Sequence, residues 1–172
     1  MVQGIVNAAS RMSSAVPFLM STLNTCLLSR QAAGRFVTAF AATLGHRGQL
    51  CYSNGGHPAP LWIRNSGEIV ELNQQGALLG VFPAFQYSQT SLQLAPGDLL
   101  ILYTDGVTEA RDRRGNLFGS ARLLDWAREQ NSRTPDEIKD SLIACVRDFS
   151  ESCGQDDDRS VLVVRYTGAI AG

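Results

Sequence analysis

The apolar positions of residues 1–30 recur at helical spacing and predict two helical segments. The second segment begins near Ser14 and carries Pro17 in its first turn, where a helix tolerates proline. Its leucines recur on one stripe, which predicts a single buried face: Leu19, Leu23 and Leu27.

From residue 36 onward the pattern changes to strands, with turn signals between the apolar runs. The predicted turns lie at 45–49, 65–67 and 96–98. Apolar and polar residues alternate over 85–94, which is typical of a half-buried strand. The stretch LLILYT (99–104) is apolar on both faces and predicts a strand in the middle of a sheet.

Helical patterns return at 120–130 and 134–152, and an apolar run near the C-terminus predicts a last strand. Thr134, Pro135 and Glu137 form the signature of a capping box at the start of the second helix. Helices, then antiparallel strands, then helices and a strand favour an α+β fold in which helices pack on sheets.

Length and composition fit one globular domain, because 172 residues with 44% hydrophobic residues can bury a substantial core. The formal net charge is −1 and no basic run occurs, so no nucleic-acid partner is expected. The apolar runs are too short for a membrane span. Four cysteines without a CxxC pair favour buried thiols and a cytoplasmic location.

Acidic residues stand beside two apolar strands. Asp105 follows the strand at 99–104, and Asp156, Asp157 and Asp158 precede the last strand. If these strands are antiparallel neighbours, the carboxylates meet at one rim of the sheet, where their repulsion favours a hard divalent cation.

Simpler interpretations of the same residues stay open at this point. Asp-Gly is a common turn dipeptide, and acidic runs are often solvated loops. Glu109 fits a surface acid, and His57 fits a loop residue between glycines and a proline.

Several ordered motifs resemble the metal-dependent protein phosphatases of the PPM type, in the branch named for the stage II sporulation phosphatase E. The resemblance extends from about Asn24 to Tyr166. The motifs, in chain order, are RFVTAF, YSNGGHPAPLWI, GALLGVF, LAPGDLLILYTDGVTEARDRRGNLFG and DDDRSVLVV.

This resemblance implies a four-layer αββα sandwich of antiparallel sheets flanked by helices, with two Mn²⁺ or Mg²⁺ ions at one end. It implies that Asp105 is a metal ligand, and that Asp157 is another, with Asp156 as the alternative one position away. Ser160 replaces the threonine usual in the last motif. The remaining candidates for supporting roles are Gly106, Glu109, Asp158 and His57. For His57 we predict a structural rather than a catalytic role.

One departure from the family pattern concerns an earlier motif of the G-D-V-S-G-H-G type, whose aspartate bridges both metals. These 172 residues contain no such motif, so we expect a single phosphatase domain, 1–172, that lacks its first strands and holds an incomplete metal site. The resemblance implies hydrolysis of phosphoserine or phosphothreonine on an anti-sigma-factor antagonist. It also implies an upstream sensor domain as a candidate partner. A homodimer is a further candidate, because the loss of the first strands would leave sheet edges uncovered. The alternative is a pseudophosphatase that binds a partner or dimerises.

Overall fold

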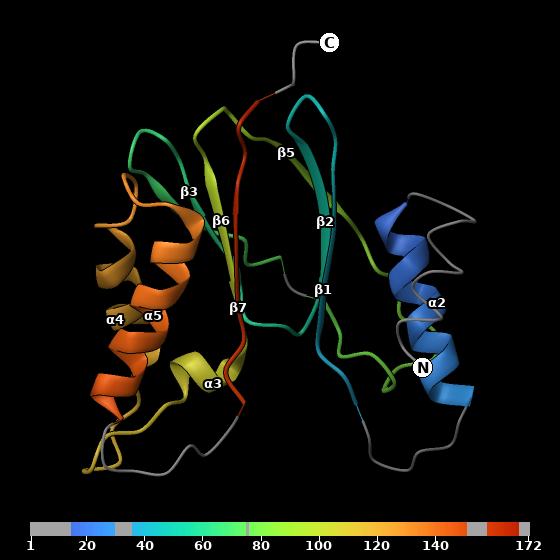
Figure 1. Cartoon of the computed structure of the whole chain (residues 1–172). Helices are drawn as coiled ribbons and strands as arrows, with labels where there is room; N and C mark the ends of the chain where they lie inside the picture. Colours follow the sequence, from blue (N-terminus) through green and yellow to red (C-terminus); the bar gives the residue numbers. More distant parts are fainter. Residues whose placement is uncertain (1–14, 30–35, 75, 151–157, 169–172) are drawn as a thin grey trace. The chain divides into compact units, whose positions relative to one another are not determined.

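The computed structural model describes four stretches of the chain: 15–29, 36–74, 76–150 and 158–168. Residue contacts divide the chain into two compact units. Unit 1 consists of Met1–His57, Asn73–Leu94 and Ala169–Gly172. Unit 2 consists of Pro58–Leu72 and Ala95–Gly168. Each unit contains one antiparallel sheet with helical structure packed on it (Figure 1).

The sheet of unit 1 has three strands in the order β1-β2-β5. They are β1 (Ala39–Leu44), β2 (Gln49–Gly55) and β5 (Thr90–Gln93). The predicted turn between β1 and β2 is confirmed, since Gly48 takes a φ of 84° there. The strand expected over 85–94 is confirmed only for β5. It is shorter because its pairing with β2 ends at Tyr52 opposite Thr90.

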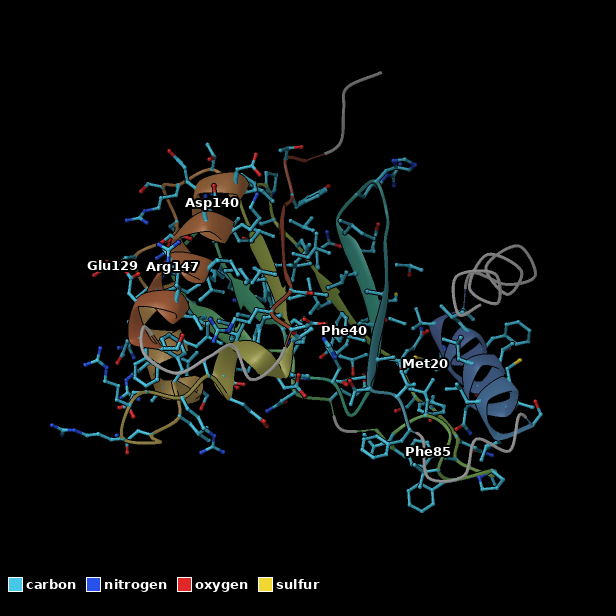
Figure 2. The ribbon with its side chains drawn as sticks, turned by 60° about the horizontal axis from the view of Figure 1, so that its bottom comes forward. Met20, Phe40, Phe85, Glu129, Asp140 and Arg147 are labelled. Carbon is cyan, nitrogen blue, oxygen red and sulfur yellow. The ribbon has the colours of Figure 1, made fainter. Side chains whose placement is uncertain are left out.

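Helix α2 (Val16–Ser29) packs against the sheet of unit 1, and Pro17 is its second residue, as predicted. Met20 is fully buried, and Figure 2 draws it on the side of α2 that faces the strands. The predicted leucine stripe is confirmed, since all three leucines join the same apolar cluster: Leu19, Leu23 and Leu27. The first predicted helical segment lies outside the described residues.

The sheet of unit 2 has four strands in the order β4-β3-β6-β7. They are β4 (Ile69–Glu71), β3 (Leu61–Ile63), β6 (Leu99–Tyr103) and β7 (Val161–Arg165). The prediction that the LLILYT stretch is central is confirmed, because β6 pairs with β3 on one side and β7 on the other. Leu99 and Ile101 are fully buried in consequence.

Three helices belong to unit 2: α3 (Asp105–Thr108), α4 (Gly119–Ala127) and α5 (Pro135–Phe149). The capping box is confirmed, with Thr134 and Glu137 bonding each other's backbone N–H groups. Figure 1 shows α4 and α5 over one face of this sheet, and Leu123, Ile138 and Leu142 fill the contact. The α+β class with antiparallel sheets is therefore confirmed. None of the helices in the described stretches combines the length and apolar character that crossing a bilayer requires.

Candidate functional site

Strand β6 delivers Asp105 to the rim of the sheet of unit 2. The strand ends at Tyr103, Thr104 is extended, and Asp105 is the first residue of the single-turn helix α3. The backbone of Asp105 is fixed, since its carbonyl accepts a hydrogen bond from the N–H of Glu109 at 2.8 Å. Its carboxylate is exposed and accepts from the N–H of Gly106 at 3.1 Å. A buried strand thus holds an acid in place while leaving the carboxylate accessible.

Thr104 joins the end of β6 to the start of β7. Its N–H donates to the carbonyl of Ser160 at 3.1 Å, and its hydroxyl donates to the carbonyl of Asp158 at 3.1 Å. The N–H of Ser160 donates back to that hydroxyl at 3.0 Å. The threonine hydroxyl therefore bonds the segment that leads into β7 instead of capping α3. The prediction that the two strands are antiparallel neighbours is confirmed, and Asp158 lies beside the residue that precedes Asp105.

Gly106 permits this junction to be tight. A Cβ atom on Gly106 would lie 2.6 Å from the carbonyl oxygen of Asp158, closer than real Cβ contacts come. Gly106, named from the sequence as a supporting residue, therefore has a packing role that the geometry explains.

Gly106→Ala is expected to push the start of β7 away from α3, because the neighbouring atom is backbone and cannot rotate aside. We expect a stability loss of about 1–3 kcal/mol, as for overpacking elsewhere. Affinity for Mn²⁺ is expected to fall roughly tenfold or more, since the carboxylate-bearing ends move apart. Thermal unfolding and calorimetric Mn²⁺ titration would measure the two effects.

Gly45→Ala is the matched control for that substitution. The Cβ it adds would come closest to the end of the flexible Gln49 side chain, at 3.0 Å, and the nearest backbone atom, the Gln49 carbonyl oxygen, would lie at 3.6 Å. Equal losses for both variants would contradict the role assigned to Gly106.

The other acids predicted for the site fall into two groups. Asp156 and Asp157 lie outside the described residues, so their assignment as ligands stays a prediction. Asp158 and Glu109 are described and exposed. Carboxylate oxygens are the donors that Mg²⁺ and Mn²⁺ prefer, so Asp105 fits one side of such a shell. Across the described stretches, however, no three His, Cys, Asp or Glu side chains come together as a metal site.

Tyr103 is the last residue of β6 and borders the site. Burial raises the pKa of its phenol to about 12, and the negative charge of Glu71 acts in the same direction. The phenol is therefore protonated at neutral pH and is unsuited to act as a base.

His57 belongs to unit 1, where Asn54 locks its loop. The N–H of His57 donates to the side-chain oxygen of Asn54 at 2.8 Å, and the Asn54 amide donates to the His57 carbonyl at 2.9 Å. The ring Nδ1 lies 3.3 Å from the hydroxyl of Thr38. These contacts fit the predicted structural role.

His57→Ala is expected to lower stability by about 1 kcal/mol, since it removes the ring contact with Thr38 but leaves both Asn54 bonds intact. In an active, full-length protein, turnover per folded molecule is expected to change little. Asn54→Ala, which breaks both loop bonds, is expected to cost more stability than His57→Ala. Melting curves and rates on the same samples would distinguish a structural from a catalytic role. A large loss of turnover with unchanged melting would argue for catalysis by His57.

Two polar residues at opposite ends of β6 have structural roles that the sequence did not reveal. Thr104 had no signal beyond its place after an apolar strand. Asp98 was quoted within a family motif, but it is a buried acceptor rather than a site residue: its carboxylate accepts hydrogen bonds from Trp62, Asn65 and Ala95. A nearly buried carboxylate needs such donors, and only the folded structure identifies them.

The fold is that of PP2C-type phosphatase domains. The SiaA-PP2C domain of Pseudomonas aeruginosa superposes with a TM-score of 0.82 at 22% identity, covering 96% of this chain and 67% of that one. The manganese-presoaked phosphatase domain of the cell fate determinant SpoIIE from Bacillus subtilis gives a TM-score of 0.69 at 19% identity, covering 99% and 76%. At such identities the likeness shows the fold alone.

The sequence then fixes the family. Residues 1–167 match the family model of stage II sporulation protein E (SpoIIE), and the chain belongs to that family. Phosphoserine phosphatase RsbU of Bacillus subtilis (strain 168) is 30% identical over 101 residues, which are 58% of this chain and 30% of RsbU. Protein IcfG of Synechocystis sp. (strain ATCC 27184 / PCC 6803 / Kazusa) is 39% identical over 92 residues, 52% of this chain and 14% of IcfG. The chain thus spans less than a third of these relatives.

Proposed function

We propose that this chain is the greater part of a metal-dependent protein serine/threonine phosphatase domain. The observation that carries the proposal is the hydrogen-bonded junction of β6 and β7, which holds Asp105 beside the start of β7. Membership of the SpoIIE family supports it, as does the likeness to RsbU, which is named a phosphoserine phosphatase.

Asp105 and Asp157 are the proposed metal ligands, with Asp156 as the alternative to Asp157. Bound Mn²⁺ or Mg²⁺ would supply Lewis acidity and a water of lowered pKa for attack on phosphorus. The carboxylate of Asp105 would hold one side of the cation, while Thr104 and Gly106 keep the two strand ends close together. A solved relative, RsbX, is described in complex with magnesium, and the SpoIIE domain was presoaked with manganese.

The proposed substrate is a phosphoserine or phosphothreonine on a regulatory protein of the anti-sigma-factor antagonist type. The names of RsbU and RsbP, both phosphoserine phosphatases, support the phosphoserine part. An additional sensor domain and a homodimer are proposed as partners. A cytoplasmic location is proposed because Cys26, Cys51 and Cys145 are free thiols in the described part of the chain.

Release of phosphate from a phosphoserine protein, with Mn²⁺ and with a chelator, tests the proposal. Residues 1–172 are compared with a version extended by residues encoded in frame upstream of Met1. We expect Mn²⁺-dependent hydrolysis from the extended protein and little from 1–172, because two metals need a bridging acid that the motifs here do not include. An inactive extended protein that still binds a phosphoprotein would favour the pseudophosphatase alternative.

A further inference from the structure

A short hairpin after α3 concentrates positive charge. It consists of residues 111–117, and we call it the arginine hairpin. Arg111, Arg113 and Arg114 are all exposed, and Asp112 is its one acid, so its net charge is +2 in a chain whose net charge is −1. The hairpin also exposes an apolar side chain, Leu117.

Backbone pairing and side-chain hydrogen bonds hold the arginine hairpin in a defined conformation. The backbones of Arg111 and Leu117 pair across it as an isolated antiparallel β-bridge. The carboxylate of Asp112 accepts from the N–H of Arg114 at 2.8 Å, and from the N–H and the amide of Asn116, both at 2.9 Å. Hydrogen bonding, led by the Asn116 side chain, lowers the pKa of Asp112. The carboxylate of Asp112 thus hydrogen-bonds within the hairpin, while the three arginines are exposed on its surface.

The same core anchors the arginine hairpin and α3. The N–H of Phe118 donates to the carbonyl of Ala110 at 2.8 Å, which closes the base of the hairpin. Ala110 and Phe118 are buried in the apolar cluster that also holds Val107 of α3. Because Asp105 is the first residue of α3, the hairpin is anchored to the same apolar cluster as the helix that carries the proposed metal ligand.

We propose that the arginine hairpin binds an acidic stretch of the substrate protein next to its phosphoserine. This inference rests on the proposed phosphatase function of the Asp105 site. Guanidinium groups pair well with carboxylates and phosphates, and a local positive charge speeds encounter with an acidic partner. Leu117 supplies an apolar contact within the same patch. Three arginines would neutralise few phosphates of a nucleic acid, so an acidic protein segment is the better match.

Binding is tested without metal and without hydrolysis. A fluorescent peptide with one serine flanked by four aspartates is compared with the same peptide carrying asparagines, and with a single-stranded oligonucleotide. We expect the chain to bind the aspartate peptide about tenfold more tightly than the asparagine peptide, with the preference shrinking as salt rises. A triple Arg111→Gln, Arg113→Gln, Arg114→Gln variant is expected to lose that preference.

The matched control changes the same charge elsewhere in unit 2. Arg128→Gln removes a positive charge at the C-cap of α4, and Lys139→Gln and Arg147→Gln remove two from α5, where Figure 2 labels Arg147. This control is expected to keep the preference. A double Arg113→Gln, Arg114→Gln variant leaves the bond from Arg111 to the Gly115 carbonyl intact, so it still tests the surface if the triple variant rearranges.

Three results would overturn the inference: equal losses in the control and the hairpin variant, no preference for the aspartate peptide, or tighter binding of the oligonucleotide. A separate rate assay uses the phosphoserine form of the aspartate peptide and a small aryl phosphate. In an active protein, the hairpin variant is expected to raise KM about tenfold for the peptide, with kcat and the aryl phosphate rate unchanged. Absence of hydrolysis by the version extended upstream of Met1 would reject the phosphatase function, while the metal-free binding result would still decide on the hairpin.

Discussion

Asp105→Asn is expected to abolish most Mn²⁺-dependent hydrolysis in an active protein that contains these residues, lowering kcat/KM by at least roughly 100-fold. The amide keeps the size of the side chain but removes the negative charge that holds a hard cation. Folding is expected to change by less than about 0.5 kcal/mol, because the carboxylate is exposed and its one described protein bond is to the next residue. Phosphate release across a Mn²⁺ titration, with melting curves beside it, measures both.

Asp125→Asn serves as the matched control, since Asp125 is an exposed acid on α4 that pairs only at the surface with Arg128. It is expected to leave both rate and stability near those of the parent. Asp157→Asn is expected to resemble Asp105→Asn if Asp157 is the second ligand. Full activity in Asp105→Asn at low Mn²⁺ would remove the basis for the proposed site.

Asp98→Ala is expected to produce the largest loss of stability, about 3–5 kcal/mol, with a fall in Tm on the order of 10 °C. Asp98 is 2% exposed, and its carboxylate accepts from the indole N–H of Trp62 at 2.9 Å and from two backbone N–H groups, of Asn65 at 2.8 Å and Ala95 at 2.9 Å. Alanine would leave these donors without their acceptor inside the fold. Chemical and thermal unfolding of unit 2 would report the loss.

Two milder variants test how the loss of stability depends on the number of hydrogen bonds removed from Asp98. Trp62→Phe removes one donor and leaves the carboxylate with both backbone bonds, so its hydrogen-bonding loss is expected to be about 1 kcal/mol. Asp98→Asn keeps one acceptor oxygen but sets an amide against a backbone N–H, so it is expected to fall between Trp62→Phe and Asp98→Ala. If Asp98→Ala unfolds no more readily than Trp62→Phe, the hydrogen-bonded carboxylate is not what stabilises this turn.

Local pattern was sufficient for most elements of the fold. The capping box at Thr134 and the central position of β6 follow from short-range chemistry, namely side-chain capping and burial on both faces of a strand. The strand expected over 85–94 was too long. Apolar and polar residues alternate over the whole stretch, but β5 pairs with β2 only over Thr90–Gln93. Beyond Tyr52, strand β2 packs against other segments: Gly55 meets Leu79, and Asn54 approaches Gly76.

The sequence by itself determined that Asp105 ends an apolar run and that acids precede the last one, because strand burial and turn chemistry are local properties. Only the tertiary structure decided that these two ends are hydrogen-bonded neighbours. The bonds of Thr104 to Asp158 and Ser160 join residues more than fifty positions apart, and no local preference specifies such a pairing. The same holds for Asp98, whose buried carboxylate is stabilised by a tryptophan 36 residues earlier. Long-range register, set by packing of the whole sheet, placed the end of β6 beside the start of β7.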